Sequence, residues 1–278
     1  MDLSIIIVSW RVKGLLEQCL ESIFNETRNL DFEVLVIDND SGDGTVEMVE
    51  NNFPRVKLVK SQINLGFARA ANLGLKRAQG RFLLLLNPDT KLIDNSLKKS
   101  VDFMEQNPAV GVLGGRLLNR DLTLQPSVRR FPRLLDHLLM ALKLHHLFPL
   151  KKYLALDFDY NKTGVVEQVM GAFFLISRRC FSQAGFLDEK YYIWFEEVDY
   201  CWRAKKAGFT VNYYPEAKII HLGGQSFRQV FTLKNQWIFS ASRLRYIRKH
   251  QGLLAYLVIL ILTPISLLLS LFNLKNGR

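Results

Sequence analysis

Cysteine is scarce in this sequence of 278 residues. Cys19, Cys180 and Cys201 are far apart and odd in number, so their spacing indicates neither a disulfide framework nor a metal cluster. This usage predicts a reducing cytoplasm. The first residues contain no basic segment followed by an apolar stretch and a cleavage site, which predicts that no secretory signal is present.

Nucleotide-binding signatures and internal repeats are also lacking. Residues 64–74 combine glycines with a helix start, yet they form no Walker loop and no G-x-G-x-x-G pattern. Acidic residues are fewer than basic ones, 26 against 37, which gives a formal net charge of +11. This surplus favours an anionic partner such as nucleic acid, a phosphorylated substrate or an anionic membrane.

Strand-like and helix-like segments alternate through much of the chain. This pattern predicts an α/β domain with a mostly parallel sheet, built by right-handed crossovers. The length suits one large domain with an appendage. We expect strands at residues 3–9, 32–37, 56–59, 83–86, 110–117, 169–177 and 218–221. We expect helices at residues 15–23, 45–51, 64–74, 97–106, 195–207 and 232–249.

The stretch at residues 81–89 organises this pattern. Its apolar run is too short for a membrane span and too apolar for a surface strand, which predicts a central strand buried on both faces. Pro88 lacks a backbone N–H, so the strand must end before it. Asp89 then follows the carboxyl end of the strand, where open α/β sheets bind ligands. Its carboxylate suits Mg²⁺ or Mn²⁺ holding a diphosphate, although Asn87, Pro88 and Asp89 are also ordinary turn formers.

Two further polar loops follow predicted parallel strands, at Ser9-Trp10 and at residues 38–43. With Asn87–Asp89 they are expected to meet at one edge of the sheet. There Asp38, Asn39 or Asp40 would accept a hydrogen bond from a pyrimidine N3–H or a ribose hydroxyl. In the 64–74 segment, Gly66 would allow close backbone approach and Arg69 would face a phosphate. The alternative is that these are turn and N-cap residues.

Two segments indicate a membrane. Residues 126–160 interleave basic and apolar residues, which fits either an interfacial helix on anionic lipid or an ordinary amphipathic helix packed on the domain. Residues 253–272 are apolar and uncharged, long enough to span a bilayer. The stronger basic flank precedes them, which places the main domain in the cytoplasm. Pro264 leaves a monotopic insertion open, and a buried core helix is the remaining alternative.

Eight motifs occur in one order: residues 6–10, 36–44, 64–74, 85–89, 170–176, 185–189, 195–203 and 221–226. In this order the chain resembles the inverting, nucleotide-sugar-dependent glycosyltransferases of family two, which have the GT-A fold, and within them rhamnosyltransferase-type enzymes. The resemblance extends from Ser4 to about Phe227. It implies a GT-A domain over residues 1–227 with a basic insert at about 126–160. A basic amphipathic linker helix at 228–252 and a transmembrane or membrane-inserted helix at 253–272 would follow.

The resemblance also implies residue roles. Asn87-Pro88-Asp89 takes the place of the Asp-x-Asp metal motif, so Asp89 is the expected main ligand of Mg²⁺ or Mn²⁺. His221 would lie near the diphosphate or the metal, unless it is a structural histidine. Glu196 and Glu197 take the place of the Glu-Asp pair that supplies the base. The expected nucleotide-sugar site comprises Ser9, Trp10, Asp38, Asn39, Asp40, Asn64, Gly66, Arg69, Asn72, Asn87 and Asp89.

Glu196, Glu197 and Asp199 fall within one turn of a predicted helix. Their mutual repulsion predicts a raised pKa for at least one of them, which suits a general base, while the helix dipole opposes that shift. We expect Glu197 to be the base, with Glu196 and Asp199 supporting it. The plainer interpretation is that all three are favourable N-terminal helix acids.

The sequence thus predicts an enzyme that transfers a sugar, with rhamnose favoured, from a nucleoside diphosphate sugar to a hydroxyl of a lipid-linked glycan. The setting would be cell-envelope polysaccharide synthesis at the cytoplasmic face of the inner membrane, without nucleic acid. Two alternatives stay open at this point. One is a sugar-nucleotide nucleotidyltransferase, although Ser9–Lys13 lacks its usual glycine-rich loop. The other is a non-catalytic, membrane-anchored subunit that binds nucleotide sugars.

Overall fold

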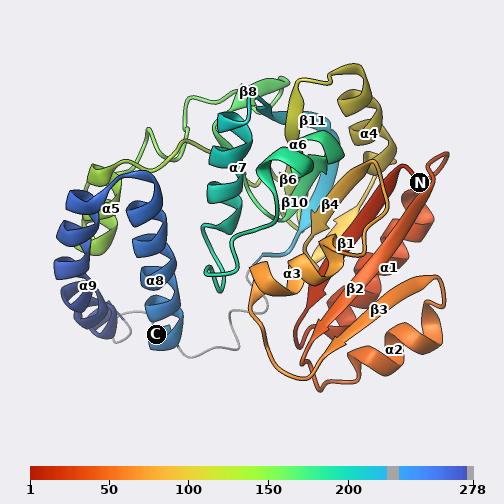
Figure 1. Cartoon of the computed structure of the whole chain (residues 1–278), viewed down its shortest axis with the longest axis horizontal. Helices are drawn as coiled ribbons and strands as arrows, with labels where there is room; N and C mark the ends of the chain where they lie inside the picture. Colours follow the sequence, from red (N-terminus) through yellow and green to blue (C-terminus); the bar gives the residue numbers. More distant parts are fainter. Residues whose placement is uncertain (224–231, 274–278) are drawn as a thin grey trace.

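A computed structural model describes residues 1–223 and 232–273, and its core is a nine-stranded sheet. The strand order is β3-β2-β1-β4-β10-β6-β11-β5, with β8 paired to β11 (Figure 1). The strands are β1 (Leu3–Ser9), β2 (Phe32–Asn39), β3 (Val56–Ser61), β4 (Phe82–Leu86), β5 (Thr90–Leu92), β6 (Val110–Leu118), β8 (Gly164–Val166), β10 (Phe173–Ser177) and β11 (Thr210–His221). A separate two-stranded sheet joins β7 (Val128–Arg129) to β9 (Gln168–Val169).

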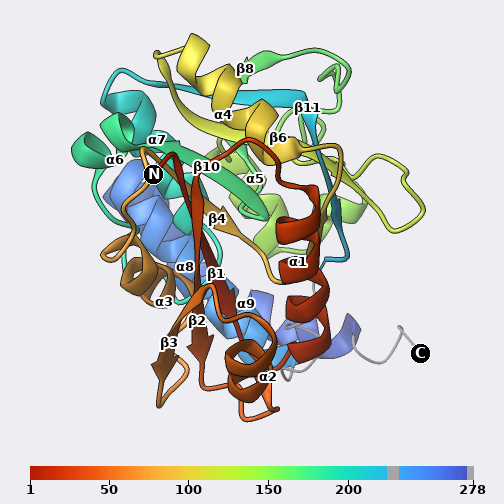
Figure 2. The ribbon, with the colours of Figure 1, turned by 90° about the vertical axis from the view of Figure 1, so that its right-hand side faces the viewer.

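Helices cover both faces of the sheet, and a further group lies to one side. Figure 2 shows α1 and α3 on opposite sides of the β1–β4 region. The helices are α1 (Lys13–Glu26), α2 (Thr45–Asn52), α3 (Phe67–Leu75), α4 (Ser96–Gln106), α5 (Leu134–Ala141), α6 (Arg178–Ala184), α7 (Glu196–Lys206), α8 (Thr232–His250) and α9 (Leu253–Asn273), with a 3₁₀ turn η1 (Leu144–His146). Together α5, α8 and α9 form a helical unit beside the sheet domain (Figure 1).

The first half of the sheet follows the predicted pattern. Strands β3, β2, β1 and β4 are parallel neighbours. β4 is buried on both faces, as predicted, because its alternating side chains feed two hydrophobic cores. Leu83 and Leu85 pack toward α3 and α7, whereas Leu84 and Leu86 pack toward α1 and α4.

The second half of the sheet is mixed rather than parallel. Strand β10 runs antiparallel to both β4 and β6, and β11 is parallel to β6 but antiparallel to β5 and β8. The single strand expected at residues 169–177 is in fact two, since Met170–Ala172 separate β9 from β10. The strand expected at 218–221 is the end of the longer β11. The short elements β5, β7, β8 and α6 were not predicted, because two to seven residues carry too little periodicity.

The basic insert differs from the extended helix that its apolar spacing suggested. Helix α5 covers only eight residues, because Lys143 adopts a left-handed backbone with φ 57° and a 3₁₀ turn follows. The rest of the segment consists of turns and β7. The two predicted C-terminal helices are present as α8 and α9, joined at Gln251-Gly252. Residues Gly224, Gln225, Ser226 and Phe227 of the motif region, together with Arg228, Lys275 and Arg278, lie outside the described residues.

Candidate active site

The register of the parallel strands brings the predicted loops to one edge of the sheet. Ser9 pairs with Asp38 at the ends of β1 and β2, and Ile7 pairs with Leu86 at the end of β4. The residues that follow, Trp10, Asn39 and Asn87, therefore share this edge. The structure confirms that the Ser9-Trp10, 38–43 and 87–89 loops converge there.

Ser9 and Asp38 offer polar atoms without a hydrogen-bond partner among the described residues. Both residues are buried, and Ser9 Oγ and Asp38 Oδ1 make no hydrogen bond to the described part of the chain. Ser41 holds the two loops together, since its Oγ donates to Ser9 O and its N–H donates to Asp38 Oδ2, each at 3.4 Å. A buried acceptor without a partner is costly unless a ligand satisfies it. Asp38 is therefore suited to accept a hydrogen bond from a base or a sugar.

Asn39 uses its whole amide to hold the neighbouring loop. Its Nδ2 donates to Asn64 Oδ1 and Gly66 O, and its Oδ1 accepts from Leu65 N–H at 2.9 Å. Tyr192 caps the same loop, with its hydroxyl 2.7 Å from Asn64 Oδ1. Gly66 has φ +77°, and an added Cβ would lie 2.5 Å from Tyr192 O. The glycine therefore permits this close approach, which also fixes where α3 begins.

The other predicted nucleotide-sugar residues have different surroundings. Asn72 is buried and exchanges hydrogen bonds with the backbone of Leu187, so its amide is already satisfied. Arg69 is exposed and lies 3.9 Å from Glu189. Asp40 is exposed with φ 66°, and Trp10 lies against the Arg11 guanidinium. Their roles in binding stay predictions.

Asp89 and His221 meet at the end of β4. Antiparallel pairing sets His221 opposite Thr90, and His221 Nε2 lies 3.4 Å from Asp89 Oδ1 and 3.5 Å from Asn87 Nδ2. His221 Nδ1 lies 2.7 Å from Gln125 Oε1, an acceptor, so Nδ1 carries the proton. His221 Nε2 is the ring nitrogen that faces Asp89. Both side chains are largely buried.

This pair fits a divalent metal. Asp89 Oδ1 and His221 Nε2 lie close enough to bind the same ion, and a carboxylate with an imidazole is a suitable ligand set for Mn²⁺. Gln125 fixes the tautomer from behind, as is usual for a metal-binding histidine. Residues 1–223 and 232–273 contain no cluster of three or more His, Cys, Asp or Glu side chains placed to hold a metal. The remaining positions would therefore go to diphosphate oxygens and water.

Glu196 and Glu197 begin α7, and their carboxylates are perturbed as predicted. Burial, followed by the charge of Glu197, raises the pKa of Glu196 well above its usual range. Burial also raises the pKa of Glu197, while backbone N–H groups at the helix start oppose the shift. Burial thus raises the pKa of these glutamates more than the repulsion between carboxylates does, although the prediction rested on that repulsion. Each glutamate has one buried oxygen without a hydrogen bond in the described structure.

The backbone before these glutamates is strained. Trp194 and Phe195 both have positive φ, 67° and 70°, a conformation that bulky residues rarely adopt. Strained backbone conformations cluster at functional sites, where they hold side chains in directions that an unstrained backbone would not allow. Glu197 lies next to Gly171 in the β9–β10 connection, with its Cβ 3.7 Å from where a Cβ of residue 171 would be. No pattern in the sequence indicates this strain.

Asp199 is held in an ion-pair network. Its Oδ1 lies 2.6 Å from Lys249 Nζ and 2.7 Å from His250 Nε2, and its Oδ2 lies 2.8 Å from Arg203 Nε. Burial opposes ionisation, yet hydrogen bonds from His250 and Lys249 and the charge of Arg203 hold the pKa of Asp199 far below its usual range. Lys249 and His250 come from the end of α8, so sequence spacing could not identify them as partners.

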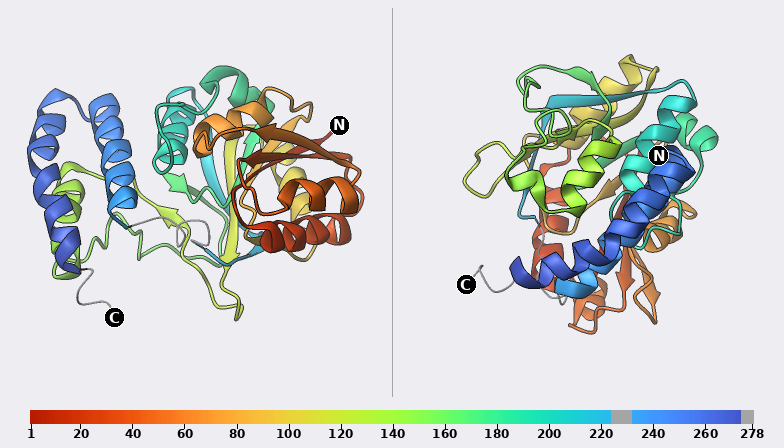
Figure 3. Two further views of the ribbon diagram at one scale, coloured as in Figure 1. Left: turned by 90° about the horizontal axis from the view of Figure 1, so that it is seen from below. Right: turned by 90° about the vertical axis from the view of Figure 1, so that its left-hand side faces the viewer.

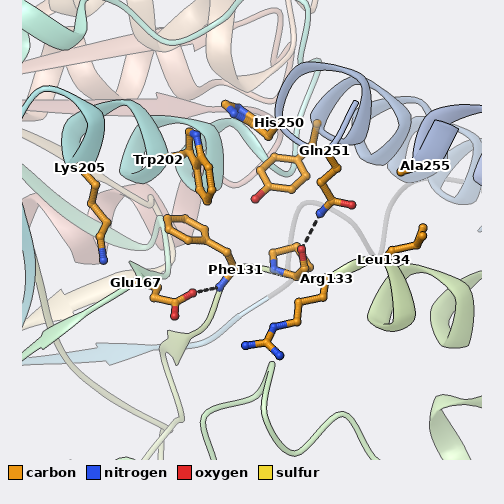
Figure 4. A pocket seen from close by; sticks show the side chains of 11 residues that line it. Phe131, Arg133, Leu134, Glu167, Trp202, Lys205, His250, Gln251 and Ala255 are labelled. Carbon is orange, nitrogen blue, oxygen red and sulfur yellow. Dashed lines mark hydrogen bonds between the residues drawn. The ribbon is translucent and has the colours of Figure 1, made fainter. Parts of the chain in front are cut away.

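Two hollows lie near these residues. One of about 340 Å³ adjoins Asp89 and is lined in part by Gln18, Lys91 and Arg120. A second, of about 630 Å³, lies behind α7, between the start of the insert and the α8–α9 corner. Figure 4 shows it between Trp202, Phe131 and Gln251, whose amide donates to Pro132 O. This second cavity includes neither Asp89 nor the two glutamates.

Comparison with known proteins identifies the class. The sequence model of Glycosyl transferase family 2 matches residues 4–180, so the chain belongs to this family. An N-acetylglucosaminyl-diphospho-decaprenol L-rhamnosyltransferase of Mycobacterium tuberculosis is 28% identical over 236 residues, covering 79% of this chain and 75% of the relative. The match to an Escherichia coli UDP-Glc:alpha-D-GlcNAc-diphosphoundecaprenol beta-1,3-glucosyltransferase is 33% identical over 105 residues, covering 37% of this chain and 41% of the relative.

Solved structures agree on the fold. A mannosyltransferase from Pyrobaculum calidifontis in complex with GDP-Man and Mn²⁺ superposes with a TM-score of 0.61 at 15% sequence identity, covering 100% of this chain and 76% of the other. At this identity the likeness shows the fold alone, which is GT-A. The protein is therefore a glycosyltransferase of family two. Family membership favours sugar transfer over the nucleotidyltransferase and the non-catalytic subunit.

Proposed function

We propose that this enzyme transfers a sugar, with rhamnose favoured, from a nucleoside diphosphate donor to a hydroxyl of a lipid-linked glycan, with inversion at the anomeric carbon. The observation that carries this proposal is the joint placement of Asp38, Asp89 and His221 at the ends of β2, β4 and β11. These side chains offer a free acceptor for a nucleoside and a metal-suited pair for a diphosphate. The rhamnosyltransferase relative supports the choice of sugar and acceptor.

The donor would lie along the edge where the strands end. Asp38 Oδ1 and Ser9 Oγ, both buried and without a hydrogen bond within residues 1–223 and 232–273, would hydrogen-bond the nucleoside. Asn39 would act indirectly by fixing the Asn64–Gly66 loop. Asp89 and His221 would hold Mg²⁺ or Mn²⁺, which would stabilise the negative charge on the departing diphosphate. The Mn²⁺-bound mannosyltransferase of the same fold supports this assignment.

Glu197 is the proposed general base. Its raised pKa makes the carboxylate a stronger proton acceptor than an ordinary glutamate. It would take the proton of the acceptor hydroxyl as that oxygen attacks the anomeric carbon, opposite the diphosphate. Glu196 would support it as its neighbour at the start of α7, and Asp199 would hold α7 in position through its ion pairs. The strained Trp194-Phe195 backbone would aim both glutamates.

We place the enzyme at the cytoplasmic face of the inner membrane, in the synthesis of a cell-envelope polysaccharide. Helix α9 is long and apolar enough to enter a membrane, a weak indication by itself. The acceptor named for the rhamnosyltransferase relative, a decaprenol-linked sugar, supports the same location.

A donor screen tests the proposal. Purified enzyme is incubated with thymidine, uridine and guanosine diphosphate sugars, with Mn²⁺ or Mg²⁺ and a prenyl-diphosphate-linked acceptor, and release of nucleoside diphosphate is measured. We expect release to be fastest with thymidine diphosphate rhamnose and to require acceptor and metal. NMR of the product gives the anomeric configuration. Retention of configuration, or a preference for another sugar, would refute the corresponding part of the proposal.

A further inference from the structure

Helix α9 exposes its large apolar side chains and buries small or polar ones, the reverse of a helix in a water-soluble protein. Its large apolar residues face outward, with Leu254 and Ile261 78% and 72% exposed. The stripe packed against the protein is mainly small or polar, and it comprises Ala255, Ile259, Thr263, Ser266 and Ser270. A helix in water buries its large apolar side chains and exposes its polar ones. The opposite arrangement is typical of a helix whose outer face contacts lipid.

The apolar surface continues beyond α9. Helix α5 packs beside α9 on the side of the helical unit that faces away from the sheet (Figure 3). Leu135 on α5 and Leu147 and Phe148 after η1 are 64%, 73% and 59% exposed. We call the exposed residues of α9 and these three the apolar face. Exposed apolar side chains gathered on neighbouring elements in this way indicate an interaction site.

The charges around the apolar face suit an anionic partner. Arg133, Lys151 and Lys152 are exposed beside α5 and η1. The last acidic residue of the whole chain is Glu216, so α8 contains basic residues but no acidic ones, and α9 contains neither. Large exposed leucines edged by cations match a bilayer that contains anionic phospholipid. A second copy of this chain would instead place like charges against each other.

The neighbours of α9 exclude a simple span. Helix α8 runs back alongside α9 from the Gly252 turn, and the two pack together. If α9 crossed the bilayer, α8 and its Arg243, Arg245 and Arg248 would enter the hydrocarbon with it, at high cost. α8 is also tied to the sheet domain, since Arg245 and Lys249 pair with Asp188 at 2.7 and 3.1 Å.

We propose that α9 lies in the plane of the membrane surface, with the apolar face inserted in one leaflet and both helix ends on the cytoplasmic side. The inference rests on the proposed action at a membrane and defines how the enzyme meets it. In this orientation the sheet domain stays in water, while α5 and α9 contact the lipid that carries the acceptor. The ion pairs of α8 stay intact, and α7 keeps a fixed relation to the membrane.

Cysteine labelling of the full-length enzyme tests the topology. The three native cysteines are buried, so single cysteines are introduced by Asn273→Cys at the end of α9 and by Lys206→Cys on the exposed end of α7. A membrane-impermeant maleimide should label both variants in inverted inner-membrane vesicles and neither in spheroplasts. Labelling of Asn273→Cys in spheroplasts would show a span and overturn the proposal. Lys206→Cys verifies the orientation of each preparation.

Lipid binding tests the apolar face separately from catalysis. The double variant Leu254→Glu/Ile261→Glu is compared with Val165→Glu, which places one glutamate at an exposed apolar residue of β8. We expect sedimentation with phosphatidylglycerol–phosphatidylcholine vesicles to weaken roughly 100-fold in the double variant only. Donor hydrolysis should be unchanged in both, which shows that they fold. The proposal would be wrong if the double variant bound vesicles as tightly as the wild type. It would also be wrong if the wild type formed a soluble dimer that the double variant abolished. A failed donor screen would not affect it.

Discussion

His250 Nε2 lies 2.7 Å from Asp199 Oδ1 and thereby joins the end of α8 to the helix that carries Glu196 and Glu197. Lys249 contacts the same oxygen at 2.6 Å. Asp199 is fully buried, so its charge depends on these partners and on Arg203. One carboxylate thus connects the helix that carries the candidate base to α8, which packs against the proposed membrane-contacting helix α9.

Replacing His250 by alanine should weaken this connection. Asp199 would keep Lys249 and Arg203, so we expect a loss of about 1–3 kcal/mol in the free energy of unfolding, measured by urea denaturation. If His250 positions α7, kcat should also fall while KM for the donor stays near wild type. Arg248→Ala, at an exposed neighbouring residue, serves as the control and should change neither quantity. Equal behaviour of the two variants would exclude a positioning role.

Glu196→Gln should stabilise the protein at neutral pH. The folded state raises the pKa of Glu196, so its contribution to stability is fully present below the unfolded value of about 4.3 and is lost as the pH rises toward the folded value. The amide of glutamine does not ionise, so the variant does not lose stability as the pH rises. We expect the free energy of unfolding of the variant to exceed that of the wild type. The difference should be about 1.4 kcal/mol for each unit by which folding raises the pKa of Glu196. Urea denaturation from pH 4 to pH 8 measures it. A gain that does not shrink toward pH 4 would contradict this origin.

Asp89→Ala should abolish metal-dependent donor turnover and leave the fold intact. The Asp89 side chain contacts His221, whereas its carbonyl accepts from Leu222 N–H and would continue to hold the turn. We expect no activity across a titration of Mn²⁺, with a melting temperature close to wild type. Asp94→Ala, which removes an exposed surface ion pair with Lys218, is the matched control. Normal activity of Asp89→Ala at every metal concentration would disprove the assignment.

The sequence predicted those parts of the site that follow strands. The continuous apolar run of β4 and the proline after it located Asp89, and parallel register then placed Asp38 and Ser9 beside it. Local patterns cannot show contacts between distant segments. Gln125 behind His221, Tyr192 on Asn64 and His250 on Asp199 were missed for this reason. The antiparallel β10 was missed because a long insert lets the chain re-enter the sheet from its other end.

The final prediction identifies the base. Glu197 and Glu196 are adjacent on α7, and side chains of consecutive helical residues point about 100° apart, so only one can face the acceptor. Glu197 lies against Gly171, which precedes β10 near the end of β4. The Glu197 side chain is also less buried than that of Glu196. Both carboxylates have a raised pKa, so the pKa alone cannot choose between them.

Glu197→Gln keeps the size and hydrogen-bonding capacity of the side chain but removes the proton acceptor. It should lower sugar transfer about 100-fold or more and leave donor affinity, measured by calorimetry, near wild type. In the wild type, transfer should fall as the pH drops through a value above the 4.5 of an ordinary glutamate, because the base becomes protonated. Glu196→Gln is the matched neighbour and should keep most of the activity. If Glu196→Gln is inactive and Glu197→Gln is not, Glu196 is the base, and if both transfer normally, the base is a different residue.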